Sequence, residues 1–191
     1  MAKFLHTADW QLGQKLRRIG GDRGARLRLE RFETVRRIAR LAHERKVEAV
    51  VVAGDVFDDN AVGDATLQAA RDALAVFRPI PVLLLPGNHD AATPDGALER
   101  LAPVEHGLDH VHTLLTAEPL RCGGATFHPC PLRRRHSADD PTRHLPARGA
   151  DEGVRVAVAH GGVLDFGETT ETPNRIDADA VLGRGFDYLA L

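Results

Sequence analysis

Polar side chains follow four apolar runs of the chain, each at the point where the run ends. Such runs are typical of buried strands in a parallel sheet. Because the carboxyl ends of parallel strands meet at one edge of a sheet, we expect these side chains to lie close together. The runs are residues 4–8, 49–53, 81–85 and 154–159, and the polar residues after them include Asp9, Gln11, Asp55, Asn88, His89, Asp90 and His160.

Carboxylate and amide oxygens together with imidazole nitrogens are ligands for a divalent metal ion of hard or borderline character. A carboxylate shared by two ions can hold them about 3.5–4 Å apart. Each residue alone has a simpler explanation, since an Asp after a strand and a Gly-Asn pair are both common in turns. Their joint occurrence at four strand ends favours a metal site.

Four segments carry a resemblance to a known family, in order along nearly the whole chain. They are His6-Thr7-Ala8-Asp9-Trp10-Gln11-Leu12-Gly13, Gly54-Asp55-Val56-Phe57, Pro86-Gly87-Asn88-His89-Asp90 and Ala159-His160-Gly161. On these segments the sequence resembles the calcineurin-like metallophosphoesterases, and most closely their DNA-repair branch, the SbcD-type nuclease subunits. The resemblance implies an α/β fold, an α/β/β/α sandwich with mixed central sheets, and two bound divalent metal ions.

The resemblance also implies a role for each site residue. Asp55 would bridge the two metal ions, Asp9 would bind one of them, and Asn88 with His160 would bind the other. His89 is similar to the family's general acid. Asp90 would orient the ring of His89 and favour its protonated form.

Gln11 stands where the family commonly has a histidine, two residues after the first aspartate. An amide oxygen still binds a hard ion, but it is a neutral donor. Gln11 as a metal ligand should therefore weaken one site and favour Mn²⁺ or Mg²⁺ over Zn²⁺, with Mn²⁺ the first expectation.

The function that the resemblance implies is metal-dependent phosphodiester hydrolysis, as a DNA exonuclease or endonuclease of the SbcD type in DNA repair. The implied partners are DNA, an SbcC-like coiled-coil ATPase and a second copy of the chain. Two alternatives stay open. One is a phosphoesterase of the same superfamily acting on small molecules or phosphoproteins, and the other is a catalytically weak scaffold that binds DNA or the ATPase.

The composition of the 191 residues is that of a soluble globular protein with one domain, with 43% hydrophobic and 27% charged residues. The net charge of −2 argues against a broadly basic nucleic-acid coat, although it does not exclude a nuclease. The sequence shows no apolar run of membrane-spanning length and no signal peptide, so we expect no membrane association and a cytoplasmic location. The two cysteines, Cys122 and Cys130, are expected to be a reduced pair.

Helical periodicity predicts helices that cover a sheet over residues 26–46 and 65–77. Shorter helices are expected over residues 95–101 and 178–182, the second capped by Gly183. The remaining predicted elements are strands over residues 111–115, 120–122, 125–128 and 186–191, with the middle two forming a hairpin around two glycines. Residues 133–152 and 165–174 have no periodicity and are expected to be loops.

A basic loop over residues 14–22 follows the first strand, beside Asp9. Its cations Lys15, Arg17 and Arg18 are candidate contacts for a phosphate backbone, and a solvated surface turn is an equally good explanation.

The sequence printed here ends at Leu191, before the loop in which family members carry further histidine ligands. The resemblance therefore implies that residues 1–191 are a metallophosphoesterase domain without its final strands. We expect such a chain to have an incomplete metal centre that binds Mn²⁺ weakly.

Overall fold

The computed structural model describes residues 2–16, 18–150, 153–163 and 173–191. Strands and helices alternate in its first half, and strands dominate its second half. Two short 3-10 helices, η1 (Ala75–Phe77) and η2 (Val104–His106), accompany the other elements. In chain order these are β1 (Phe4–Thr7), α1 (Gly21–Arg45), β2 (Ala49–Ala53), α2 (Asp64–Leu74), β3 (Val82–Leu85), α3 (Ala97–Leu101), β4 (Val111–Thr113), β5 (Leu120–Cys122), β6 (Ala125–Pro129), β7 (Val154–Val158), β8 (Gly162–Val163), β9 (Arg175–Ile176), α4 (Ala178–Gly183) and β10 (Tyr188–Ala190).

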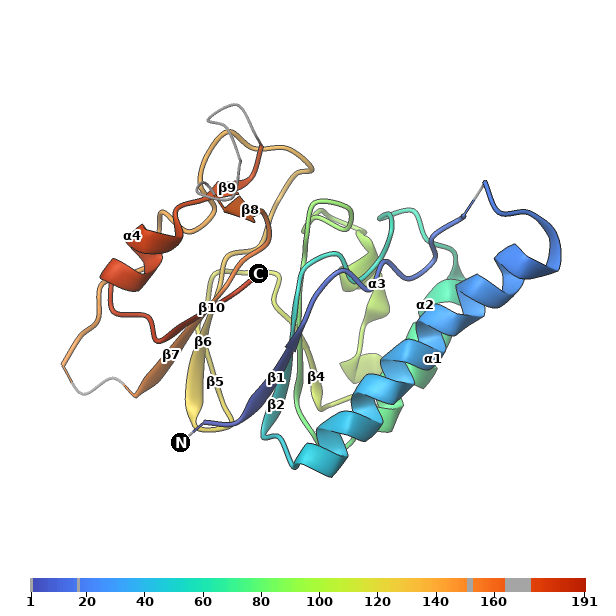
Figure 1. Cartoon of the computed structure of the whole chain (residues 1–191), viewed down its shortest axis with the longest axis horizontal. Helices are drawn as coiled ribbons and strands as arrows, with labels where there is room; N and C mark the ends of the chain where they lie inside the picture. Colours follow the sequence, from blue (N-terminus) through green and yellow to red (C-terminus); the bar gives the residue numbers. More distant parts are fainter. Residues whose placement is uncertain (1, 17, 151–152, 164–172) are drawn as a thin grey trace.

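The strands form two four-stranded sheets with the orders β1-β2-β3-β4 and β10-β7-β6-β5, and β8 with β9 forms a small third sheet. Helices α1, α2 and α3 lie on one side of the sheets and α4 on the other, as Figure 1 shows. The α/β sandwich expected from the sequence is therefore confirmed.

Mixed pairing is confined to the second sheet, where β5 and β6 are antiparallel, whereas the first sheet is parallel throughout. The difference follows from the connections. Helical crossovers join the first strands, and such crossovers link parallel strands. The two-residue turn Gly123-Gly124 joins β5 to β6, and both glycines have a positive φ, as tight hairpin turns require.

The layers follow from the alternation of side chains along the buried strands. In β2, Val50 and Val52 pack in the apolar cluster that α1 and α2 also line. Ala49, Val51 and Ala53 point the other way, into a second cluster shared with β6 and β7. This second cluster holds the two sheets face to face, so residues at the ends of strands from both sheets can meet.

Helix α1 begins at Gly21, five residues before the expected start, and therefore includes the end of the basic loop. Asp22 lies in its first turn, where a carboxylate is favourable beside the helix dipole. At the other end Lys46 adopts a left-handed conformation and its N–H donates to the last carbonyls. The buried face of α1 is formed by Gly24, Phe32, Val35, Ala39 and Ala42.

Helix α4 includes Gly183, which is its last residue and not the cap that the sequence predicted. The left-handed turn comes two residues later, at Gly185, whose φ is 79°. The helix is capped at its start, where Asp177 accepts a hydrogen bond from the N–H of Ala180.

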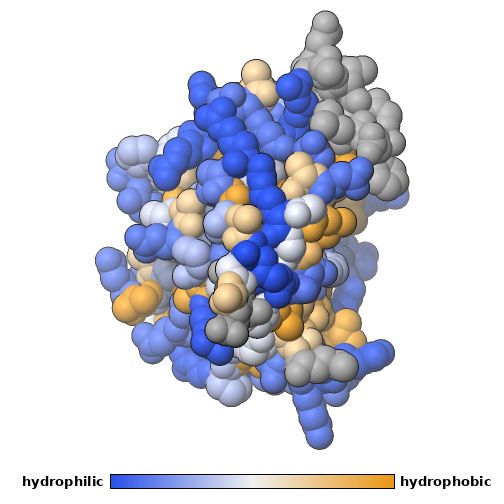
Figure 2. Space-filling view, turned by 90° about the vertical axis from the view of Figure 1, so that its left-hand side faces the viewer, coloured by the Kyte–Doolittle hydropathy of each residue, from blue (hydrophilic) through white to orange (hydrophobic). Residues whose placement is uncertain are grey.

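Residues 133–150 form neither helix nor strand, as expected. The segment is nevertheless bound to the second sheet through the buried side chain of Arg155, which donates to the carbonyl oxygens of Pro146 and Arg184. Figure 2 shows the side of the molecule that carries α4, where hydrophilic side chains dominate and hydrophobic ones are scattered. Most of the second expected loop, residues 165–174, lies outside the described residues.

Candidate metal centre

Three predicted ligands, Asp9, Asp55 and His160, come together so that one ligand atom of each lies within 4.8 Å of the others. Asn88 adjoins them, with Oδ1 3.0 Å from Nε2 of His160. Asp9, Asp55 and Asn88 follow β1, β2 and β3 of the first sheet, and His160 follows β7 of the second. The centre therefore lies where the carboxyl ends of strands from both sheets meet.

The loops after β1 and β2 continue to pair beyond the strands, which sets the positions of the two aspartates. The N–H of Asp9 donates to the carbonyl oxygen of Gly54 at 3.1 Å, and that of Gln11 to the carbonyl oxygen of Asp55 at 2.8 Å. Asp9, Gln11 and Asp55 all have left-handed backbone angles, with φ of 54°, 45° and 51°. Such angles cost roughly 1–3 kcal/mol each and are found where a site needs the side chain aimed in one direction.

Two glycines allow the strand ends to approach each other. A Cβ atom placed on Gly54 would lie 2.3 Å from the ring of His160, and one on Gly87 would lie 2.1 Å from Oδ1 of Asp55. Gly54 also has a φ of 95°. The loop of Asp55 can therefore lie against His160 and against the loop after β3 only because Gly54 and Gly87 have no side chain.

The hydrogen bonds of His160 indicate that the centre fits a cation. Its Nδ1 lies 2.9 Å from the carbonyl oxygen of Ala53, which only accepts, so Nδ1 carries the proton. In the neutral ring, Nε2 is then a bare lone pair that faces Oδ1 of Asn88 at 3.0 Å and Oδ1 of Asp55 at 3.5 Å. Lone pairs that converge in this way are the donor set of a metal ion, and the backbone partner on Nδ1 is the usual support of a metal-binding imidazole.

His89 lies beside the same carboxylate and is partly open to solvent, with 26% of its side chain exposed. Its backbone N–H donates to Oδ1 of Asp55 at 2.9 Å, and its Nε2 lies 3.9 Å from Oδ2 of Asp55. Its Nδ1 donates to the carbonyl oxygen of Asp58 at 2.8 Å. Nε2 is therefore the ring atom that is free to exchange a proton at the centre.

Asp90 has a different place from the one expected for it. Its two carboxylate oxygens accept from the backbone N–H groups of Gly87 and Phe57, at 2.7 and 2.9 Å, so it ties the loop after β3 to the loop after β2. Burial raises the pKa of the Asp90 carboxyl to about 6, against the two hydrogen bonds that lower it. The ring of His89 is oriented instead by the carbonyl oxygen of Asp58, a backbone atom that no sequence pattern reveals.

Gln11 is linked through Gln14 to helix α1. Oε1 of Gln11 accepts a hydrogen bond from Gln14, a residue outside the predicted site. Lys15 is exposed and lines a pocket of about 430 Å³ together with Asp58 and Asp59. Arg18 is exposed, and Arg17 lies outside the described residues.

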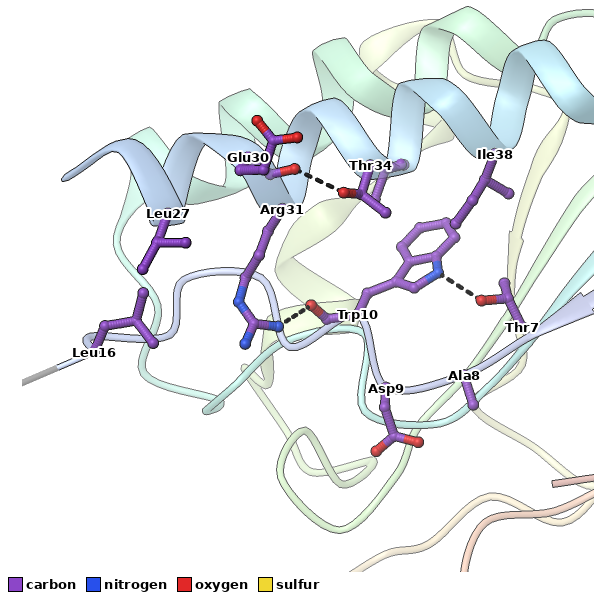
Figure 3. A pocket seen from close by; sticks show the side chains of 11 residues that line it. Thr7, Ala8, Asp9, Trp10, Leu16, Leu27, Glu30, Arg31, Thr34 and Ile38 are labelled. Atoms are coloured by element: carbon purple, nitrogen blue, oxygen red, sulfur yellow. Dashed lines mark hydrogen bonds between the residues drawn. The ribbon is translucent and has the colours of Figure 1, made fainter. Parts of the chain in front are cut away.

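A second pocket, of about 390 Å³, lies between the loop after β1 and helix α1. Figure 3 shows its lining, in which Trp10, Leu27 and Ile38 provide apolar surface and Arg31 reaches down from the helix. The carboxylate of Asp9 points away from this pocket in the same view. The loop after β1 therefore separates the pocket from the metal centre.

The model of one protein family, described as calcineurin-like phosphoesterase, matches residues 2–184. The chain belongs to this family. The resemblance found in the sequence is thereby confirmed, and the Asp and His group of the centre is a possible metal site of a metallophosphoesterase. This places the protein in a hydrolase superfamily that is metal-dependent.

Two bacterial relatives are named as the SbcD component of the nuclease SbcCD. The chain is 33% identical to that of Rhodobacter capsulatus over 180 residues, which are 82% of this chain and 40% of the relative. It is 31% identical to that of Bacillus subtilis over 124 residues, which are 62% of this chain and 29% of the relative. The chain thus spans less than half the length of these relatives.

Across the described parts of the chain, every helix is too short or too polar to cross a membrane.

Proposed function

We propose that this chain hydrolyses phosphodiester bonds in DNA at a centre of two divalent metal ions. Asp9, Asp55, Asn88 and His160 would hold the ions, with Mn²⁺ as the first candidate and Mg²⁺ as the second. Bound ions of this kind acidify a water molecule and neutralise charge on the phosphoryl oxygens. The observation that carries the proposal is the convergence of Asp9, Asp55 and His160 within 4.8 Å, because it requires loops from two sheets.

The remaining chemical need is a proton for the departing oxygen, and we assign this role to His89. Its Nδ1 proton is engaged with the carbonyl oxygen of Asp58, so the ring presents Nε2 to the centre. Oδ2 of Asp55 lies 3.9 Å from that atom. An imidazolium held there can protonate the leaving oxygen.

DNA as the substrate is supported by the two relatives, whose names describe part of a nuclease. Cations on two loops agree with a phosphate backbone as ligand. Lys15 is on the loop after β1, and Arg133 and Arg134 are on the loop after β6, where the carbonyl oxygen of Leu132 accepts from the N–H of Ala92 at 2.7 Å. On the basis of the same relatives, we propose an SbcC-like ATPase and a second copy of the chain as partners.

Hydrolysis of bis(p-nitrophenyl) phosphate in Mn²⁺ tests the enzymatic part of the proposal. We expect activity that chelation removes and that Asp55→Asn lowers by about a hundredfold or more, because the shared carboxylate is lost. Asp109→Asn, which makes the same chemical change at an exposed residue, should be neutral. Equal activity of the Asp55 variant and the unsubstituted chain would refute a metal centre at this place.

Competition separates the substrate classes. A DNA oligonucleotide should inhibit hydrolysis of the nitrophenyl diester at low ionic strength and lose potency as salt is added, since phosphate contacts release counterions. Stronger inhibition by mononucleotides than by DNA would favour a small-molecule phosphoesterase. DNA binding without any hydrolysis would favour the scaffold.

A further inference from the structure

A series of hydrogen bonds links helix α1 to the metal centre. Arg31 of α1 donates from Nη1 to the carbonyl oxygen of Trp10 at 3.0 Å, and from Nη2 to Oε1 of Gln14. Gln14 donates from Nε2 to Oε1 of Gln11 at 3.2 Å. Figure 3 shows the first of these bonds, with Arg31 extending from the helix to the carbonyl group of Trp10. The side chain of Gln11 is therefore held from the side of α1.

The chemistry of Arg31 fixes the orientation of both amide groups. A guanidinium group has five N–H donors and no acceptor, so the atom of Gln14 that faces it is Oε1. The NH₂ group of Gln14 then faces Gln11, and the atom of Gln11 that accepts is again Oε1. The NH₂ group of Gln11 is thereby turned away from Gln14, and no described residue of the chain accepts a hydrogen bond from it.

Gln11 lies directly beside the centre. Its backbone N–H donates to the carbonyl oxygen of Asp55 at 2.8 Å, and Asp9 precedes it by two residues. The Gln11 residue is half-buried. The NH₂ nitrogen of Gln11 is not among the buried side-chain atoms that lack a partner, so its two N–H donors are open to solvent and available to an oxygen atom of a bound phosphate.

The positive charge of Arg31, at the start of this series of hydrogen bonds, also favours an anion next to Gln11, at its end. Arg31 is a cation, and polarisation along connected hydrogen bonds strengthens the last donors in the series. The same charge opposes a metal cation on Gln11, whose Oε1 already accepts a hydrogen bond from Gln14. A phosphate oxygen fits the NH₂ group of Gln11 better than a metal ion fits its oxygen.

We propose that Gln11 donates a hydrogen bond to a phosphate oxygen of the substrate rather than binding a metal ion, and that Gln14 and Arg31 are positioning residues for this donor. The inference rests on the proposed function, because it needs a phosphate at the centre. It gives Gln11 a task that the histidine expected at this position by family resemblance would not have, and it leaves metal binding to Asp9, Asp55, Asn88 and His160.

Calorimetry with two probes tests the assignment without any measurement of turnover. The first titration is Mn²⁺ into the metal-free chain, and the second is inorganic phosphate into the Mn²⁺-loaded chain. For Gln11→Ala we expect a Kd for Mn²⁺ within about twofold of the unsubstituted chain, and a Kd for phosphate raised about tenfold, as for loss of one hydrogen bond to a charged group. Gln68→Ala, at an exposed glutamine of α2, is the matched control and should change neither constant.

For Gln11→Glu, a role as metal ligand and a role as hydrogen-bond donor to phosphate predict opposite results. A carboxylate would strengthen a metal site, but it would repel phosphate at a donor site. We expect phosphate affinity to fall more in Gln11→Glu than in Gln11→Ala. Thermal unfolding of each variant identifies any general loss of structure.

The positioning role of Arg31 is tested by Arg31→Leu. This variant should weaken phosphate binding severalfold with little effect on Mn²⁺, because the amide of Gln11 is no longer held. Arg37→Leu is the matched control, since Arg37 is on the same helix and pairs with Glu30 at the surface.

A loss of Mn²⁺ affinity of tenfold or more in Gln11→Ala would overturn the inference, and so would unchanged phosphate affinity. If the unsubstituted chain binds Mn²⁺ and phosphate in those cases, the proposed function stands and only the role of Gln11 is wrong. Failure of the unsubstituted chain to bind either probe would refute the proposed function and the inference together.

Discussion

Nε2 of His160 lies 3.0 Å from Oδ1 of Asn88, although 72 residues separate the two in the chain and they follow strands of different sheets. The ligand set is therefore complete only when the two sheets are packed face to face. The apolar cluster between the sheets, which includes Val51, Leu85 and Phe127, provides that packing. Metal affinity at the proposed centre should thus depend on the sheet interface as well as on the ligands.

Removal of the second sheet's ligand should weaken metal binding. We expect His160→Ala to raise the Kd for Mn²⁺ at least tenfold in calorimetry, because the imidazole is the one nitrogen donor of the proposed set. The exposed loop residue His136 offers the control variant His136→Ala, which should bind as the unsubstituted chain does. Unchanged affinity in His160→Ala would remove His160 from the ligand set.

Replacement of His89 should act on the chemical step and leave the metal in place. For His89→Ala we expect Mn²⁺ affinity close to that of the unsubstituted chain. Turnover of a diester with a poor leaving group, such as phenyl, should fall by about a hundredfold or more, and turnover of the nitrophenyl diester should fall much less. Equal losses on the two substrates would contradict a role as general acid.

Local patterns in the sequence were sufficient to place most elements of this fold. Apolar runs such as residues 49–53 and 81–85 are buried strands, and the parallel order of the first sheet brings their carboxyl ends together. Helix boundaries were less certain, because the start of α1 at Gly21 depends on local turn geometry and not on the apolar stripe.

Contacts made by backbone atoms, or made between segments far apart in the chain, were not predictable. The carbonyl oxygen of Asp58 orients the His89 ring, and every residue type has such an oxygen. The family resemblance implied that Asp90 orients that ring, yet its carboxylate accepts hydrogen bonds from two backbone N–H groups. The link from Arg31 to Gln11 spans a helix and a loop, and no spacing rule connects them.

His6 in β1 of the first sheet contacts the C-terminal segment, which carries β10 of the second sheet. Its Nε2 donates to the carbonyl oxygen of Leu191 at 2.9 Å, and its Nδ1 accepts from the hydroxyl group of Tyr188 at 3.1 Å. Burial lowers the pKa of His6 below its ordinary value of 6.5, against the hydrogen bond to Leu191, which raises it. The neutral ring is therefore the form that the folded chain favours.

The lowered pKa of His6 makes the free energy of unfolding depend on pH. Above pH 6.5 the ring is neutral in the folded and the unfolded chain, and the full contribution of His6 to the free energy of unfolding is present. As the pH falls through 6.5 the unfolded chain takes up a proton that the folded chain does not, so the free energy of unfolding decreases. Urea unfolding at about pH 7.5 and about pH 5.5 should show a smaller difference between the two conditions for His6→Gln than for the unsubstituted chain. An equal or larger difference would mean that His6 does not contribute.

Gly87 lies where the loop after β3 touches Asp55. A Cβ atom at this position would be 2.1 Å from Oδ1 of Asp55 and 2.4 Å from its backbone nitrogen. The backbone nitrogen has no freedom to move away, because the loop of Asp55 is also paired with the loop after β1 through Gln11. The constraint is one of space alone, since Gly87 does not have a left-handed φ.

We therefore expect Gly87→Ala to lower the free energy of unfolding by roughly 1–3 kcal/mol, as for overpacking of a closed site, and to raise the Kd for Mn²⁺ at least tenfold by displacing Asp55. Gly183→Ala is the matched control, because a Cβ there meets no atom within 4 Å and the residue is helical. That variant should keep its metal affinity and gain up to about 1 kcal/mol. Chemical denaturation and Mn²⁺ calorimetry of both variants decide the matter, and normal metal binding in Gly87→Ala would show that Asp55 tolerates a shift of its neighbouring loop.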